Sequence, residues 1–289
     1  MKIQTITIKL KKFANLFFKI FYKVRIGRVI MDFISKVAMQ RSISITHKDE
    51  TLLLTVPNAL NRWRVETYST KEPEMLIWID GLTRGSVLWD IGANVGLYSI
   101  YAAKARNCTV CAFEPSIFNL ELLARNTFLN DLSGQITVVP LPLTGEKGIN
   151  KLHLTSTDWG GALSTFGSEA IGHDGKPIEE KGIFKKVFEY QTLGVSMDDA
   201  VDMLNIPTPD YIKMDVDGIE HIILGGGQKV LKNVKSVIIE INDDFEEQGV
   251  VAHRILKESG LILSEKVHSE VVEKIDEFRL TFNQIWIRK

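Results

Sequence analysis

Two short apolar segments, 87–91 and 110–113, each end in residues that suit the binding of a nucleoside. The residues concerned are Asp90, Gly92, Asn94 and Gly96 at the first segment and Glu114 and Pro115 at the second. Glycines let the backbone turn sharply and approach a ligand where a Cβ would collide. Glu114, 18 positions after Gly96, can accept hydrogen bonds from both hydroxyls of a ribose. The pattern therefore predicts two parallel strands joined by a helix, with a cofactor that has a free ribose diol.

The order of residues in the first turn distinguishes between cofactors. A dinucleotide-binding turn reads G-x-G-x-x-G and places helix amides against a pyrophosphate, whereas this turn reads Asp90-x-Gly92-x-Asn94-x-Gly96. A carboxylate there would repel a pyrophosphate but would attract a sulfonium or an amino group. The turn therefore favours S-adenosylmethionine over NAD. A glycine-rich turn without any ligand is the structural alternative.

Three segments of the chain resemble a known enzyme family. Residues 89–98 (WDIGANVGLY), 112–116 (AFEPS) and 212–221 (IKMDVDGIEH) are similar, in order and spacing, to the FkbM-type S-adenosylmethionine-dependent methyltransferases. The resemblance covers residues 67–289. It implies a class I methyltransferase sheet and transfer of a methyl group to an oxygen, usually a sugar or polyketide hydroxyl. The resemblance does not imply a particular acceptor.

The third segment holds the candidate catalytic residues. A carboxylate within an apolar strand is costly to bury unless it is paired, and Lys213 or a ligand would have to compensate Asp215. We expect Asp215 to orient the acceptor hydroxyl or to accept its proton, with His221 as the other candidate base. Asp217 and Glu220 match a helix capping box with Asp217 as N-cap, so a structural role is favoured for both.

The same acidic residues raise the question of a metal ion. Asp215, Asp217 and Glu220 have the oxygen ligands that a divalent cation prefers, but their spacing does not require one. No metal ion is predicted.

Residues 144–195 interrupt the alternation of strands and helices and are too long for an ordinary connection. An insertion at the carboxyl end of a sheet is where an acceptor site would be built. Trp159 could stack on a sugar and Ser164 could hydrogen-bond to a hydroxyl, although a glycine-turn hairpin capped by a tryptophan explains them equally well. Glu240, at the end of a later strand, is a further candidate for substrate binding.

Charge divides the chain into two parts. The first 41 residues contain ten Lys/Arg and one acidic residue, whereas residues 42–289 carry a net charge of −10. We therefore expect a basic amphipathic helical extension over 1–41 and a methyltransferase domain over 42–289. An acidic domain argues against a nucleic-acid partner. The stripe at 13–24 has helical spacing, and lysines interrupt it too often for a membrane span or a signal peptide. It could lie on an anionic membrane surface or pack on the domain.

The pattern of elements predicts an α/β fold with a mostly parallel, seven-stranded, Rossmann-like sheet covered by helices on both faces. Residues 43–56 are expected to form a hairpin. Helices are expected at 66–80, 116–129, 197–204, 220–231 and 245–258, and later strands at 136–143, 151–155, 211–216, 237–241, 261–267 and 283–288. The last two strands are expected to be antiparallel. Cys108 and Cys111 should point to opposite faces as structural thiols, compatible with a reducing cytoplasm.

Taken together, the residues favour an O-methyltransferase that uses S-adenosylmethionine and acts on a hydroxyl of a glycan, a lipid-linked saccharide or a secondary metabolite. The expected location is the cytoplasm, with peripheral contact to the inner face of a membrane as an option. The alternatives are a nicotinamide-dependent oxidoreductase, which the first turn disfavours, and a non-catalytic, membrane-docked module that binds nucleosides. Asp215 at the edge of the sheet argues against the non-catalytic module.

Overall fold

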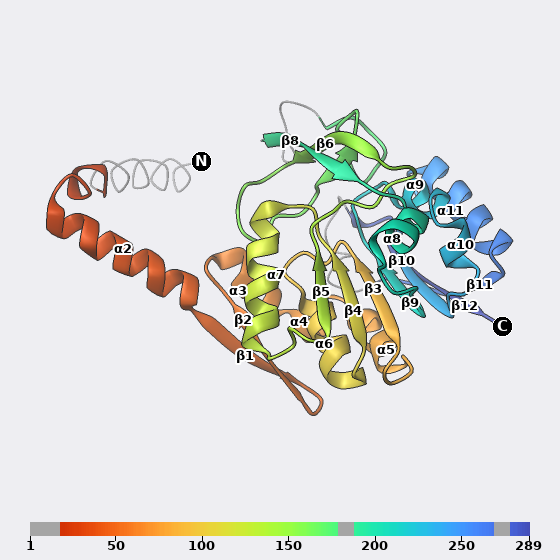
Figure 1. The fold of residues 1–289 in the computed structure, drawn as a ribbon, viewed down its shortest axis with the longest axis horizontal. Coiled ribbons are helices and arrows are strands. Elements are labelled where there is room, and N and C mark those ends of the chain that lie inside the picture. Colours follow the sequence, from red (N-terminus) through yellow and green to blue (C-terminus); the bar gives the residue numbers. More distant parts are fainter. Residues whose placement is uncertain (1–17, 179–187, 269–277) are drawn as a thin grey trace.

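The centre of the molecule is a seven-stranded sheet with the order β11-β12-β10-β9-β3-β4-β5 (Figure 1). The computed structural model describes residues 18–178, 188–268 and 278–289. The strands are β3 (Val87–Ile91), β4 (Thr109–Phe113), β5 (Ile136–Val139), β9 (Tyr211–Met214), β10 (Ser236–Asn242), β11 (Leu261–Val267) and β12 (Thr281–Arg288). All neighbours from β10 to β5 are parallel, while β12 pairs antiparallel with both β10 and β11. The expected sheet and its antiparallel closing pair are confirmed.

The strand order reverses between β3 and β9, which places a crevice at the carboxyl ends of these two strands. Residues Leu88–Ile91 of β3 pair with Tyr211–Met214 of β9, and Val87–Ile91 pair with Thr109–Phe113 of β4. In open α/β sheets a ligand binds outside the carboxyl ends of the strands at such a reversal. The three segments singled out in the sequence therefore meet at one edge of the sheet.

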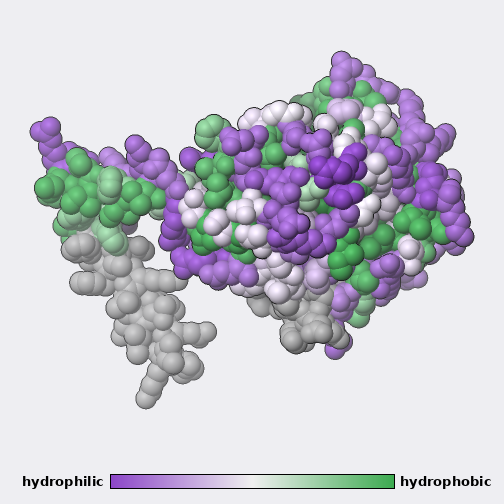
Figure 2. Space-filling model, turned by 90° about the horizontal axis from the view of Figure 1, so that it is seen from below, coloured by the Kyte–Doolittle hydropathy of each residue, from purple (hydrophilic) through white to green (hydrophobic). Residues whose placement is uncertain are grey.

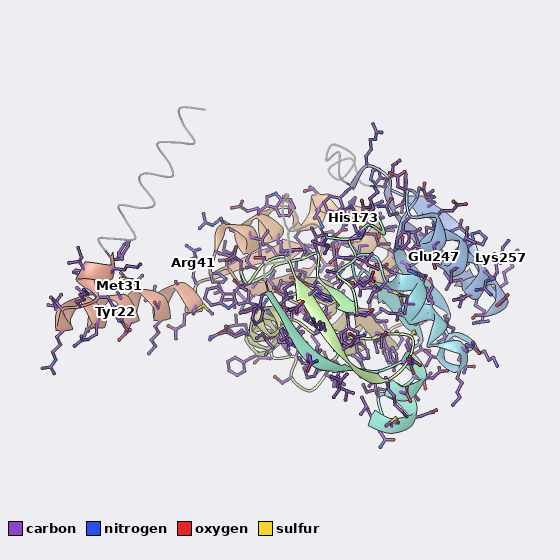
Figure 3. All side chains as sticks on the ribbon, turned by 90° about the horizontal axis from the view of Figure 1, so that it is seen from above. Tyr22, Met31, Arg41, His173, Glu247 and Lys257 are labelled. Carbon is purple, nitrogen blue, oxygen red and sulfur yellow. The ribbon has the colours of Figure 1, made fainter. Side chains whose placement is uncertain are left out.

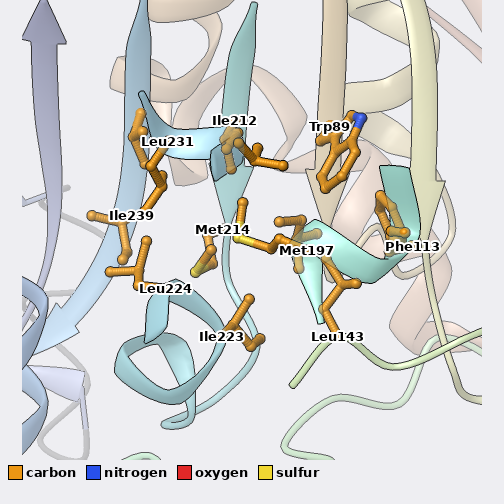
Figure 4. Close-up of a cluster of buried hydrophobic side chains, with 14 of the residues drawn as sticks. Trp89, Phe113, Leu143, Met197, Ile212, Met214, Ile223, Leu224, Leu231 and Ile239 are labelled. Atoms are coloured by element: carbon orange, nitrogen blue, oxygen red, sulfur yellow. The ribbon is translucent and has the colours of Figure 1, made fainter. Parts of the chain in front are cut away.

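Helices cover both faces of the sheet. One face packs against α5 (Pro73–Asp80), α6 (Leu97–Arg106) and α7 (Ile117–Leu129), and the other against α8 (Met197–Leu204), α9 (Glu220–Gly225), α10 (Gln228–Leu231) and α11 (Glu246–Glu258). On the second face, Met197, Leu224 and Leu231 pack against Trp89 and Ile239 of the sheet (Figure 4). Burial of these apolar side chains stabilises the fold by about 1.5–3 kcal/mol each.

Two expected helices are divided where the backbone cannot continue. The segment expected as one helix over 66–80 forms the end of α3 (Ala59–Glu66), α4 (Tyr68–Lys71) and α5. Pro73 has no N–H and disfavours helical backbone at the residue before it, so Glu72 adopts φ −141° and α5 begins afresh. The segment 220–231 is divided into α9 and α10 by Gly226 and Gly227, because glycine is a poor helix former.

The insertion contains a second, three-stranded antiparallel sheet of order β7-β6-β8. Its strands are β6 (Gly148–Leu154), β7 (Thr165–Gly167) and β8 (Phe188–Gly194). The expected strand at 151–155 thus corresponds to part of β6, and residues 179–187 lie outside the described residues.

The two cysteines occupy opposite faces of the sheet, as expected. Cys108 packs in the core under α5 and α6, whereas Cys111 packs in the core under α8 and α9. Both are buried and free, and burial raises the pKa of each thiol. These properties fit structural thiols.

An antiparallel hairpin and a separate helix precede the sheet. The hairpin is formed by β1 (Ser42–His47) and β2 (Glu50–Thr55), as expected. Before it, α2 (Arg25–Gln40) extends away from the body of the molecule, and its side chains, among them Met31, stand apart from the body (Figures 1 and 3). Only part of the predicted stripe, from residue 18 onward, falls within the described residues. None of the described helices is long and apolar enough to cross a membrane.

Candidate functional site

A cavity of about 360 Å³ lies at the strand-order reversal. It brings together seven of the residues predicted from the sequence: Gly92, Asn94, Glu114, Pro115, Ser164, Asp215 and Glu240. The turn after β3 and the end of β4 form one side, and the segment after β9 together with β10 forms another. The cavity therefore joins the predicted cofactor side to the predicted acceptor side.

The turn after β3 is shaped by close packing of its backbone. The amides of Gly92 and Ala93 both donate to the carbonyl of Phe113, at 3.0 Å each. Gly92 has φ 79°, and a Cβ there would lie 1.9 Å from the carbonyl oxygen of Asp215. Gly96 has φ 84° and faces Leu123 of α7, outside the cavity lining. Gly92 thus allows β3 and β9 to end against each other, and Gly96 allows α6 and α7 to pack.

Glu114 is held in a fixed position at the cavity wall. Its Oε2 accepts the amide of Asn94 at 2.8 Å, and its Oε1 accepts the amide of Ser116 at 2.8 Å. Burial raises the pKa of the Glu114 carboxyl to about 7, although these donors lower it in part. The backbone of both strand ends therefore positions the carboxylate that we expected to bind a ribose.

The expectation that Asp90 faces the ligand is not met. Its carboxylate is 1% exposed and lies beneath the cavity, 3.2 Å from Lys213 Nζ, with a 2.5 Å hydrogen bond from Ser99. Lys213 in turn donates to the Gly92 carbonyl at 2.9 Å and lies 3.5 Å from Asp215 Oδ2. Burial would lower the pKa of Lys213, but Asp90 and Asp215 raise it above its usual value. Asp90 therefore lies outside the cavity lining and pairs with Lys213, which does line the cavity.

Three carboxyl groups gather at the other side of the cavity. Burial would raise the pKa of Asp215, but Lys213, Lys71 and a hydrogen bond from Glu240 hold it below its usual value. Burial and the charge of Asp215 raise the pKa of Asp217 to about 6, and the same two causes raise that of Glu240 well above its usual value. Asp215 is therefore the most readily ionised of the three carboxyl groups, and it lies beside a Glu240 that holds its proton more strongly than a free glutamate.

The predicted capping box at Asp217 is wrong. Helix α9 begins after Ile219, and Asp217 adopts φ 63° with its Oδ2 accepting the amide of Leu163 at 2.7 Å. Glu220 instead reaches back to accept the amides of Val216 and Gly218, at 3.0 Å each. The left-handed turn, which Asp tolerates, points the Asp217 carboxylate into the cavity.

Glu220 lies outside the cavity lining, and it accepts a further 2.5 Å hydrogen bond from Gln248. In the described part of the chain no three His, Cys, Asp or Glu side chains are arranged to hold a metal ion.

The loop 158–164 of the insertion closes over the strand ends. Asn94 and Asn119 both donate to the Gly161 carbonyl, at 2.9 and 3.0 Å, and Ser164 lines the cavity. The side chain of Trp159 turns away: its indole N–H donates to Glu121 at 3.0 Å, outside the cavity lining. The insertion therefore contributes Ser164 and neighbouring loop residues to the cavity lining, whereas Trp159 lies outside it.

His221 does not reach the cavity. Its ring is packed edge to face against Phe245, with ring centroids 5.4 Å apart, and burial lowers its pKa. It lies on α9, which begins at Glu220, and neither Glu220 nor His221 lines the cavity. The geometry therefore favours Asp215 over His221.

Several cavity residues had no signal in the sequence. Lys71 and Glu72 come from the break between α4 and α5, and Tyr98 comes from the first turn of α6. Glu72 accepts the Tyr98 hydroxyl at 2.6 Å and pairs with Lys71 at 3.2 Å. Arg64 of α3 also lines the cavity and donates to the Gly160 carbonyl at 2.8 Å. Charged residues in a helix break look like ordinary surface residues until the tertiary structure places them.

Comparisons with known proteins find a methyltransferase relative and several distant structural likenesses. The hexuronic acid methyltransferase AglP of Haloferax volcanii is 24% identical over 219 residues, which cover 72% of this chain and 76% of AglP. Precorrin-6y C5,15-methyltransferase from Geobacter metallireducens superposes with a TM-score of 0.43 at 15% identity, covering 76% of this chain and 89% of that one. M. jannaschii TYW2 in complex with AdoMet gives 0.43 at 11% identity, covering 86% and 87%. Both structures are distant likenesses.

The family comparison is more specific. The Methyltransferase FkbM domain matches residues 90–278, well over half of the chain. This range begins at Asp90, near the end of β3, and includes Glu114, the insertion and the three carboxylates Asp215, Asp217 and Glu240. The chain therefore belongs to the FkbM family of methyltransferases.

Proposed function

We propose that this enzyme transfers the methyl group of S-adenosylmethionine to a hydroxyl of a sugar. The observation that carries the proposal is the single cavity lined both by Glu114 with the turn after β3 and by Asp215 with Asp217 and Glu240. Membership of the FkbM family supports methyl transfer, and the name of its relative AglP supports a sugar acceptor.

The residues on the cofactor side fit S-adenosylmethionine. Glu114 offers a fixed carboxylate for a ribose diol, and the Oδ1 of Asn94 is a buried acceptor with no protein partner among the described residues. No phosphate-binding turn is present at β3, because the loop carries Asn94 where a dinucleotide turn would place a glycine. When bound, S-adenosylmethionine supplies an activated methyl group on a cationic sulfur.

On the acceptor side, ionised Asp215 would accept a hydrogen bond from the acceptor hydroxyl and orient its oxygen toward the methyl carbon. In the reaction an O–C bond forms as the C–S bond breaks, S-adenosylhomocysteine leaves, and the hydroxyl proton must be removed. Asp215 is a weak base because its pKa is lowered. Asp217, with a pKa of about 6, is better matched to accept the proton near neutral pH.

Cationic groups at the cavity suggest the acceptor class. Arg64 and Lys71 both line it, and the buried Nε of Arg64 has no partner among the described residues. Guanidinium and ammonium groups would favour a sugar that carries a carboxylate. We therefore infer that an acidic sugar is the acceptor.

The test has two parts. Mass spectrometry of the purified protein should find S-adenosylhomocysteine or S-adenosylmethionine bound, and bound NAD would overturn the proposal. Methyl transfer from isotopically labelled S-adenosylmethionine should then be measured on glucuronic acid saccharides and on matched glucose saccharides. We expect a higher kcat/KM for the acidic series; equal rates would reject the acidic acceptor but keep the sugar, and transfer to neither would reject the sugar.

A further inference from the structure

Helix α2 presents an apolar face that no other described element covers. Six large apolar residues of the helix are at least 41% exposed: Ile26, Val29, Ile30, Phe33, Ile34 and Val37. At 100° per residue these positions fall on one side of the helix. A space-filling view shows them as a hydrophobic patch on a segment that stands away from the body (Figure 2). A patch of this kind on a protein surface marks an interaction site.

The charge of this segment is opposite to that of the body. Residues 18–41 contain six Lys/Arg and one acidic residue, Asp32, whereas residues 42–289 carry a net charge of −10. Arg25, Arg28 and Lys36 belong to α2 itself and lie away from the apolar side. An amphipathic helix with cationic residues beside an apolar face is suited to a surface that is both apolar and negatively charged.

We propose that α2 docks the enzyme on the surface of an anionic lipid bilayer. The helix would lie in the plane of the membrane, with its apolar face among the acyl chains and its cationic residues at the headgroups. A second copy of the chain is the weaker occupant, because it would bring two positively charged helices together. The sequence left open whether the helix packs on its own domain, and the exposure of these six residues favours the membrane.

Docking there would also tether the cavity to the bilayer. The hairpin β1–β2 follows α2 directly, and α3, which contacts β1, contributes Trp63 and Arg64 to the cavity lining. An enzyme held in this way would meet acceptors that are themselves bound to lipid. This consequence rests on the proposed function, whereas the docking itself does not.

The experiment measures co-sedimentation of the full-length protein with phosphatidylglycerol/phosphatidylcholine vesicles, without cofactor or acceptor. The double variant Ile26→Ser/Phe33→Ser should lower the vesicle partition coefficient at least about tenfold, since two large side chains leave the acyl region. The matched control is Ile149→Ser/Phe128→Ser, which removes side chains that are 73% and 72% exposed, against 68% and 67% for Ile26 and Phe33. The control should stay within about twofold of wild type.

Further measurements distinguish docking on an anionic membrane from association with a second copy of the chain. Vesicles of phosphatidylcholine alone should bind at least about tenfold more weakly, because they carry no net negative charge. Salt at 1 M should weaken binding to the anionic vesicles by a similar factor, because charge attraction is screened beyond about 3 Å at that ionic strength. Equal sedimentation of wild type and the α2 double variant would overturn the proposal. A wild-type dimer that sediments without vesicles in analytical ultracentrifugation, and that the double variant converts to monomer, would assign the face to a second copy. Circular dichroism confirms that each variant is folded.

Discussion

The strand ends of the central sheet carry two groups of carboxylates, and the two groups differ in their interactions. Asp90, within β3, and Glu114, directly after β4, each have defined partners: Lys213 and Ser99 for the first, and the amides of Asn94 and Ser116 for the second. Asp215, Asp217 and Glu240, on the β9 and β10 side, lie close enough to shift one another's pKa.

Under the proposed function, this difference separates a preorganised side of the site from a reactive side. Fixed hydrogen bonds on the β3–β4 side hold a shape that a cofactor can enter without rearrangement. Carboxyl groups whose environments push their pKa values apart, on the β9–β10 side, provide both an ionised and a protonated group at one pH. The comparison predicts that substitutions on the two sides will change different measurements.

The largest expected effect comes from Asp215→Asn. This variant keeps the shape and removes the charge that would orient the acceptor hydroxyl, so turnover should fall by about 10²–10⁴. The affinity for S-adenosylmethionine, measured by calorimetry, should change little. Near-normal turnover would move the chemistry to Asp217, and a parallel loss of cofactor affinity would show that the two sides are not separable.

Lys213→Met tests whether Lys213 connects the two sides. Without it, Asp90 would be left buried and without its cation, and breaking a buried pair costs about 3–5 kcal/mol of unfolding free energy. Urea denaturation measures this loss. Adding Asp90→Asn in the same background should recover part of the stability, because the uncompensated charge is removed. A loss below about 1 kcal/mol for the single variant would show that the pair is not needed for the fold.

The smallest effect is a pH dependence of cofactor affinity set by Glu114. Its pKa of about 7 in the ligand-free protein means that the carboxyl is protonated below that pH. Ribose hydroxyls donate to the ionised form, so affinity should be fully present above about pH 7 and should fall as the pH falls below it, by at most about tenfold per pH unit.

Calorimetric titrations from pH 5.5 to 8.5 measure this slope. The Glu114→Gln variant is the control, since it cannot ionise and should bind more weakly at pH 8 with a flatter profile. A wild-type slope equal to that of the variant would place the titrating group elsewhere.

The sequence predicted the strands and helices that have a regular apolar periodicity. It missed features whose backbone conformation depends on a proline or on residues distant in the chain. Alternating apolar strands and amphipathic helices indicated the sheet, and the glycine turn indicated where its ligand end lies. The capping prediction for Asp217 failed because Leu163, 54 positions away in the chain, supplies the amide that this carboxylate accepts. The continuous helix over 66–80 failed at Pro73.

Residue types and spacing determined the fold class and the positions of Glu114 and Asp215 at strand ends, because side-chain alternation follows from local pattern. The resemblance of three motifs indicated the family. Only the tertiary structure decided which carboxylates reach the cavity. Asp90 is buried against Lys213 and is removed from the cavity surface, and the ends of β3 and β9 meet so closely at Gly92 that a Cβ there would lie 1.9 Å from the Asp215 carbonyl oxygen. Long-range contacts of this kind set both the geometry and the pKa values of the site, and no local pattern encodes them.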